Sequence, residues 1–154
     1  MEIRDLLTPE SVVANLKVTS KKQALQEISK RIANLVGQDE RKIFELLLER
    51  ERLGTTGVGD GIAIPHGKLK SLDRLYGLFA RLERPINFES IDERPVDLIF
   101  LLLAPETAGA DHLKALARVS RLFRDKKICD KLRGSDTPEA LYALLTEQTA
   151  SRAA

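Results

Sequence analysis

Two histidines are the residues of this chain best suited to chemistry near neutral pH. A neutral imidazole accepts and releases charged groups in that range, and the chain has only His66 and His112. His66 stands between Pro65 and Gly67, and the run Ile62–Ile64 precedes Pro65. Proline fixes its own φ and keeps the preceding residue extended, and glycine admits backbone angles that other residues avoid. We therefore expect His66 at the abrupt end of a short extended segment, presented to a cleft.

His112 is expected in the first turn of a helix that follows a long apolar strand. Ligands of layered α/β folds bind outside the ends of strands, so the two histidines are candidates to face one another across a cleft. Separate packing of each histidine is the alternative. The flanking proline and glycine favour a functional role for His66, whereas the sequence by itself leaves His112 undecided.

A glycine-rich run, Gly57–Gly61, precedes His66. It does not match a dinucleotide-binding fingerprint, because a strand and not a helix is expected after it, and it lacks the Gly-Lys-Ser/Thr ending of a P-loop. Its amide groups are candidates to contact a phosphoryl group. A plain turn explains the glycines equally well.

The charged run Glu49–Arg52 closes a predicted helix and is typical of a solvated face. One of its arginines could still reach a phosphate, because the planar guanidinium fork matches that geometry. A metal site would need both histidines plus Asp60 or Asp111, and no ligand spacing recurs. Cys129 has no histidine near it in the sequence, which disfavours a catalytic thiol.

The elements that position these residues follow from hydrophobic periodicity and from turn signals. Apolar residues at helical spacing predict four main helices, which start near Ser20, Asp39, Asp111 and Thr137. Strands are predicted at Val12–Val18, Ile62–Ile64, Leu75–Leu82 and Val96–Ala104. The last of these is apolar nearly throughout, as a strand covered on both faces should be. We therefore predict an α/β fold, with a single domain over residues 1–148, a mixed β-sheet with helices packed on both faces, and a frayed tail over 149–154.

Composition limits the function classes. The 154 residues carry a net charge of +2 and are 31% charged, which is typical of a globular protein and gives no sign of a nucleic-acid specialist. No apolar run approaches membrane-spanning length, and the N-terminus lacks the features of a signal peptide. A single cysteine fits a reducing compartment. We therefore expect a cytoplasmic protein.

Two stretches carry a resemblance to a known family. They are Leu48–Lys68, which contains Gly-Ile-Ala-Ile-Pro-His ending at His66, and Phe100–Glu106 followed by Asp111-His112-Leu113. In these the chain resembles the enzyme IIA components of the phosphoenolpyruvate phosphotransferase system, of the fructose/mannitol class (type 2), in their nitrogen-regulatory branch. The resemblance runs from about Ile3 to about Leu145, and no key position departs from the pattern.

The resemblance implies a phosphotransferase component with a mixed β-sheet covered by helices. His66 would be the phosphoacceptor, with its tele nitrogen Nε2 as the expected atom, although the sequence alone does not choose between the ring nitrogens. His112 would be a second active-site histidine, and Arg50 would lie near the phosphoryl group. The donor would be a small phosphohistidine carrier of the HPr or NPr type, charged by enzyme I from phosphoenolpyruvate. No cofactor and no metal are expected.

The resemblance also implies partners and leaves alternatives. Regulatory targets such as potassium transport proteins or sensor kinases are expected, with no nucleic acid and no membrane insertion. One alternative is a sugar-transport IIA that passes phosphate to a fructose- or mannitol-type IIB domain. The other is a non-enzymatic binding module in which His66 and His112 hold a metal or merely pack.

Overall fold

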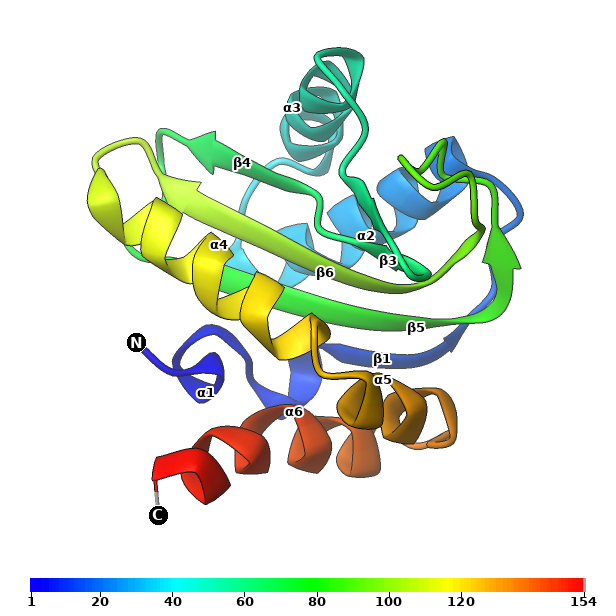
Figure 1. Cartoon of the computed structure of the whole chain (residues 1–154). Coiled ribbons are helices and arrows are strands. Elements are labelled where there is room, and N and C mark those ends of the chain that lie inside the picture. Colours follow the sequence, from blue (N-terminus) through cyan, green and yellow to red (C-terminus); the bar gives the residue numbers. More distant parts are fainter. Residues whose placement is uncertain (154) are drawn as a thin grey trace.

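A mixed β-sheet forms the middle layer of the computed structural model, and helices cover both of its faces (Figure 1). The structure describes the backbone of residues 1–153 and the side chains of residues 1–147. The helices are α1 (Ile3–Leu6), the 3-10 helix η1 (Pro9–Ser11), α2 (Lys21–Val36), α3 (Glu40–Arg52), α4 (Ala110–Phe123), α5 (Lys126–Arg133) and α6 (Pro138–Ala153). The strands are β1 (Val12–Leu16), β2 (Gly57–Gly59), β3 (Ile62–Ala63), β4 (His66–Leu69), β5 (Tyr76–Ile86) and β6 (Val96–Pro105). The predicted fold class is confirmed, and the tail expected over 149–154 lies outside the described side chains.

Strand β6 is the centre of the sheet. The strand order is β1-β5-β6-β3-β2, and β4 also pairs with β6. β6 is antiparallel to β5 and parallel to both β3 and β4. Its side chains from Leu98 to Ala104 are all buried, because helices cover both faces of the sheet, as the apolar run predicts.

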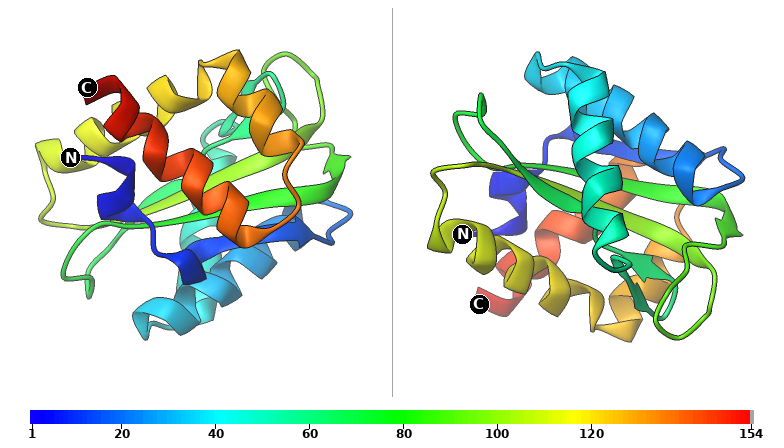
Figure 2. Two further views of the ribbon diagram at one scale, coloured as in Figure 1. Left: turned by 90° about the horizontal axis from the view of Figure 1, so that it is seen from below. Right: turned by 90° about the horizontal axis from the view of Figure 1, so that it is seen from above.

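Two hydrophobic cores form on the two faces of the sheet. Alternate side chains of β6 point to opposite faces, so Ile99 and Leu101 belong to one core and Phe100 and Leu102 to the other. Helices α2 and α3 close the first core, and α1, α4, α5 and α6 close the second. Figure 2 shows α3 crossing one face of the sheet and α6 crossing the other. The β6 segment is thereby fixed from both sides.

The chain differs from the prediction around His66. The strand expected over Ile62–Ile64 is β3 (Ile62–Ala63), and His66 begins a separate strand, β4, instead of ending an extended segment. The interruption has a local cause: the Ile64 amide donates to the Thr56 carbonyl at 2.9 Å, and Pro65 has no amide hydrogen to donate. Pairing with β6 resumes at His66, which lies opposite Leu102.

Further elements, β2 and α5 among them, were not predicted. Part of the expected glycine-rich loop is β2, which pairs with β3 in an antiparallel hairpin. Helix α5 is separate from α4, because the Asp125 side chain accepts hydrogen bonds from the amides of Lys127 and Ile128 and so caps a new helix.

Candidate functional site

The His66 ring is held by its own backbone neighbourhood. Its Nδ1 lies 2.8 Å from the carbonyl oxygen of Ile64. A carbonyl only accepts hydrogen bonds, so Nδ1 of the neutral ring carries the hydrogen and Nε2 carries the free lone pair. Because β4 pairs with β6 from His66 onward, the strand fixes the backbone on one side of the ring and the Ile64 carbonyl fixes the ring itself.

The electrostatics of the site keep His66 neutral. Burial lowers the pKa of His66 below its usual value, the hydrogen bond to Ile64 raises it, the charge of Arg50 lowers it and that of Glu51 raises it. The net shift is downward. At neutral pH Nε2 is therefore available as a nucleophile.

Gly67 serves a different purpose from the one that the sequence suggests. Its φ is not among the positive values in the chain, so the expected need for an unusual backbone angle is wrong. A Cβ at this position would instead lie 2.8 Å from the Leu46 side chain of α3. The glycine thus allows α3 to lie directly against β4. Arg50 follows Leu46 by one helical turn, so it lies on the same face of α3.

His112 lies against His66. It stands in the first turn of α4, is 7% exposed, and its ring centroid is 5.8 Å from that of His66. In Figure 1, β4 and β6 run side by side and end on the same side of the molecule, where α4 begins. The His112 pKa is lowered by burial and by the charges of His66 and Lys68. Its Nε2 is buried and has no hydrogen-bond partner among the described residues.

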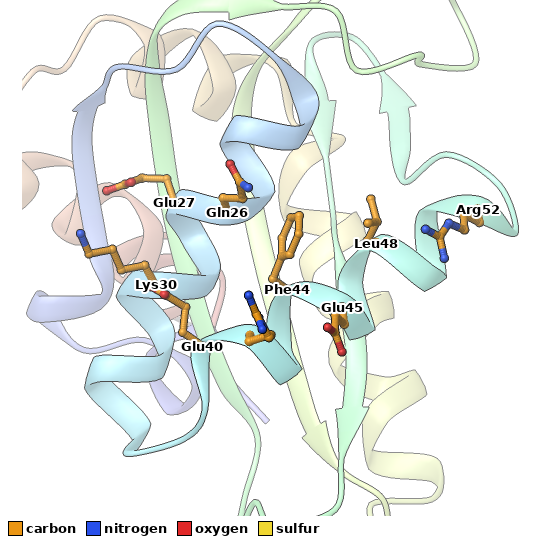
Figure 3. Close-up of a pocket in the computed structure, with 9 residues that line it drawn as sticks. Gln26, Glu27, Lys30, Glu40, Phe44, Glu45, Leu48 and Arg52 are labelled. Atoms are coloured by element: carbon orange, nitrogen blue, oxygen red, sulfur yellow. The ribbon is translucent and has the colours of Figure 1, made fainter.

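The two arginines at the end of α3 have different contacts. Arg50 donates from Nη1 to the Gly54 carbonyl at 2.9 Å and lies close enough to lower the pKa of His66. Arg52 pairs with Glu49 at 2.7 Å. It also lines a groove of about 630 Å³ between α2 and α3, in which Phe44 and Leu48 lie among charged side chains (Figure 3). Neither histidine lines this groove.

The glycine-rich run Gly57–Gly61 is not positioned as a phosphoryl cradle. Its hairpin pairs β3 with β6 at Leu98 and Ile99, whereas His66 pairs at Leu102. Two of its amides are already used: that of Gly57 donates to Thr55 Oγ1, and that of Asp60 donates to an Asp92 carboxylate oxygen. The expectation that these amides contact a phosphoryl group is not supported by this arrangement.

Two charged residues near the histidines were not identified as site residues from the sequence. Lys68 follows His66 in β4 and lies near His112. Glu51 is buried, although it belongs to a charge run interpreted as a solvated face. A signal for Glu51 was present, because it continues the buried stripe of Ile43 and Leu47 at intervals of four residues.

The structure gives little support to a metal site or to a catalytic thiol. Among the side chains of residues 1–147, no three His, Cys, Asp or Glu are grouped so as to hold a metal ion. The histidine pair therefore lacks the third protein ligand that a catalytic zinc site uses. Burial raises the pKa of the Cys129 thiol, which disfavours the reactive thiolate.

Comparison with known proteins assigns this chain to a family. The model of the enzyme IIA type 2 component of the phosphoenolpyruvate-dependent sugar phosphotransferase system matches residues 5–148. The chain belongs to this family. The particular assignment, to the nitrogen-regulatory branch, is also confirmed by its relatives.

Three relatives support that assignment. The chain is 61% identical to a nitrogen regulatory protein of Bradyrhizobium diazoefficiens, with 99% of this chain and 100% of the relative covered. It is 42% identical to a nitrogen regulatory protein of Klebsiella oxytoca, over 96% of this chain and 91% of the relative. The crystal structure of the nitrogen regulatory protein IIA-Ntr of Neisseria meningitidis superposes with a TM-score of 0.88 at 35% identity, covering 94% of this chain and 99% of that one. Within residues 1–153, no helix is long and apolar enough to cross a membrane.

Proposed function

We propose that this protein accepts a phosphoryl group on Nε2 of His66 from a phosphohistidine carrier of the HPr or NPr type. The observation that carries the proposal is the 2.8 Å contact of Nδ1 with the Ile64 carbonyl. It assigns the hydrogen to Nδ1 and leaves the lone pair on Nε2. Enzyme I and phosphoenolpyruvate supply the phosphoryl group, and the chain needs no cofactor of its own.

The transfer step is a displacement at phosphorus. The Nε2 lone pair forms a bond to phosphorus while the bond from phosphorus to the donor histidine breaks, and that electron pair returns to the donor ring. The hydrogen on Nδ1 of His66 stays in place. Such a loose transition state mainly needs positioning and stabilisation of charge on the phosphoryl oxygens.

Two side chains are our candidates for that stabilisation. The charge of Arg50 acts on His66, and its guanidinium offers planar donors that match phosphoryl oxygens. Nε2 of His112 is a buried polar atom without a partner among the described residues. A phosphoryl oxygen would give it one, and burial of an unpaired polar atom is otherwise unfavourable.

Exposed apolar residues near the site fit a docking protein. Leu53 is 84% exposed at the end of α3, three residues after Arg50, and Leu113 is 69% exposed next to His112. Large apolar side chains at such positions are typical of interaction surfaces. Docking would bring the donor histidine to Nε2 and exclude water from the transfer.

The output is regulatory in this proposal. Relatives at 61% and 42% identity are named nitrogen regulatory proteins, so we infer that phosphorylation of His66 changes binding to regulatory targets in the cytoplasm. Potassium transport proteins and sensor kinases are the target classes to test first.

Intact-mass analysis tests the proposal. The protein is incubated with enzyme I, the phosphocarrier and phosphoenolpyruvate, and is kept alkaline until measurement. We expect one phosphoryl adduct that acid removes and that is missing in His66→Ala. Full labelling of His66→Ala would contradict the proposal, provided that the donors are active. Rapid loss of the adduct to an added fructose- or mannitol-type IIB domain would favour the sugar-transport alternative.

A further inference from the structure

A buried carboxylate adjoins the site and has no part in the proposed transfer. Glu51 follows Arg50 at the end of α3, and its side chain is only 4% exposed. Its Oε1 lies 2.9 Å from Nζ of Lys21, whose side chain is 16% exposed. A buried ion pair is not by itself a gain in stability, because both charges must be desolvated. The placement of Glu51 therefore invites a role beyond pairing with Lys21.

A continuous chain of hydrogen bonds connects Glu51 with His66. The Thr56 amide donates to Glu51 Oε1 at 3.0 Å, and the Thr56 hydroxyl donates to Glu51 Oε2. The Thr56 carbonyl then accepts from the Ile64 amide at 2.9 Å. The Ile64 carbonyl in turn accepts from Nδ1 of His66 at 2.8 Å. Each of these residues is thus held by the one before it.

We propose that Glu51 is a positioning residue for His66, which fixes the Thr56 and Ile64 backbone so that Nδ1 stays the donor and Nε2 the nucleophile. This inference rests on the proposed phosphotransfer function. Glu51 is not among the site residues that the family resemblance implies, and its ion pair with Lys21 helps to hold the carboxylate at the start of the chain of hydrogen bonds.

The charge of Glu51 supports the same step. When Nε2 bonds to phosphorus, the ring retains the Nδ1 hydrogen and gains positive charge, and a nearby carboxylate stabilises that charge. Other charged or titratable groups also surround the site: the charge of Arg50 from α3 lowers the His66 pKa, the His112 ring from α4 lies against His66, and the charge of Lys68 from β4 acts on His112. Of the charged groups that influence His66, Glu51 is the one that raises its pKa.

A purely structural role for the ion pair between Glu51 and Lys21 leads to a different expected result. If Glu51 matters only as the partner of Lys21, then removing both charges together should repair the damage of removing one. If the carboxylate itself acts on His66, the damage should remain. Three variants separate these cases: Glu51→Gln, Lys21→Met and the double variant Glu51→Gln/Lys21→Met.

Two readouts are measured on each folded variant. One is the NMR titration of the His66 ring nitrogens, which reports its pKa and tautomer. The other is the rate of phosphoryl transfer from the phosphocarrier across pH. We expect Glu51→Gln to lower the His66 pKa and to slow transfer at least about tenfold. Lys21→Met should slow transfer less than Glu51→Gln does and should not lower the His66 pKa, because the two hydrogen bonds from Thr56 still hold the carboxylate.

The double variant decides between the two cases. We expect it to behave like Glu51→Gln in both readouts, even where its stability recovers. Recovery of the wild-type rate and titration in the double variant would overturn the proposal, as would a Glu51→Gln protein with unchanged readouts. If Glu51→Gln does not fold, Thr56→Val removes one of the two bonds to Glu51, and a wild-type rate and tautomer in that variant would overturn the proposal instead.

The experiment also separates this inference from the proposed function. Absence of phosphorylation in the wild-type protein would contradict the function. The ring titration needs no phosphoryl transfer, so it still shows whether Glu51 controls the state of His66.

Discussion

The rings of His66 and His112 meet edge to face, with 5.8 Å between their centroids and 63° between their planes. The two residues come from β4 and α4, and the whole of β5 and β6 lies between them in the sequence. A proton on either ring opposes a proton on the other, and burial disfavours both. The pair therefore enters any reaction at neutral pH as two neutral imidazoles, one of which has an unpaired buried nitrogen.

Replacement of His112 tests its part in transfer. His112→Ala removes the Nε2 atom that would contact the phosphoryl group and leaves the acceptor in place. We expect transfer to slow about 10- to 100-fold, a loss typical of one donor to a developing charge, while the final extent of labelling is unchanged. The measurement is a single-turnover time course with the phosphocarrier. An unchanged rate would reduce His112 to a packing residue.

Replacement of Arg50 tests the second donor, with Arg52 as a matched control. Arg50→Ala should slow transfer by about tenfold or more, and loss of its bond to Gly54 should cost about 1 kcal/mol of unfolding free energy. Arg52 pairs with Glu49 and lines the groove between α2 and α3 (Figure 3). Arg52→Ala should therefore transfer at the wild-type rate. Equal losses in both variants would point to a general effect of charge and not to Arg50.

The histidine pair predicts a pH dependence of stability. The pKa of each histidine is lowered in the folded protein from an ordinary value of 6.5. The unfolded chain thus binds more protons as the pH falls, so the free energy of unfolding should be highest above about pH 6.5 and should decrease on acidification toward the lowered pKa values. Urea unfolding between pH 7.5 and 5.5 measures this.

A control isolates the histidines in that experiment. The variants His66→Gln and His112→Gln lack the titrating rings, so each should show a shallower decrease than the wild type over the same range. Stability that stays level or increases as the pH falls would contradict the inferred neutral state of both rings.

The sequence predicts the parts of this fold in which pattern and environment agree. The β6 run is apolar because both of its faces are covered, and α2 is capped by Ser20, whose hydroxyl accepts from the Gln23 amide. β4 could not be predicted in the same way. His66–Leu69 has no alternation of apolar residues, and it becomes a strand because β6 offers it backbone partners beyond the end of β3. Such pairing depends on the tertiary arrangement and leaves no local signal.

The candidate site was likewise predictable from the sequence only in part. His66 stands out from its neighbours in the chain, whereas its proximity to His112 depends on where α4 starts relative to β6. Glu51 was hidden by composition, because a run of alternating charges is normally solvated. Its helical phase with Ile43 and Leu47 was the better guide, since burial follows the face of a helix and not the type of residue alone.

The contact between Gly67 and α3 gives the last prediction. A Cβ at Gly67 would lie 2.8 Å from the Leu46 side chain, so Gly67→Ala should force α3 and β4 apart. We expect a loss of about 1–3 kcal/mol in unfolding free energy, as for other overpacked sites. Phosphoryl transfer should also slow, because Arg50 and His66 belong to the two elements that separate. Urea unfolding and the transfer time course measure the two effects.

A second substitution and a control test whether the contact with Leu46 causes these losses. Leu46→Ala opens the space that the new methyl group needs, so the double variant should recover part of both losses, which is a favourable coupling in a double-mutant cycle. Gly134→Ala is the matched control: a Cβ there meets the Asp130 carbonyl at an ordinary 3.5 Å, and its φ of −87° suits alanine. That variant should be as stable as the wild type or slightly more stable. If Gly67→Ala behaves like Gly134→Ala, then the close approach of α3 to β4 is not what requires glycine beside His66.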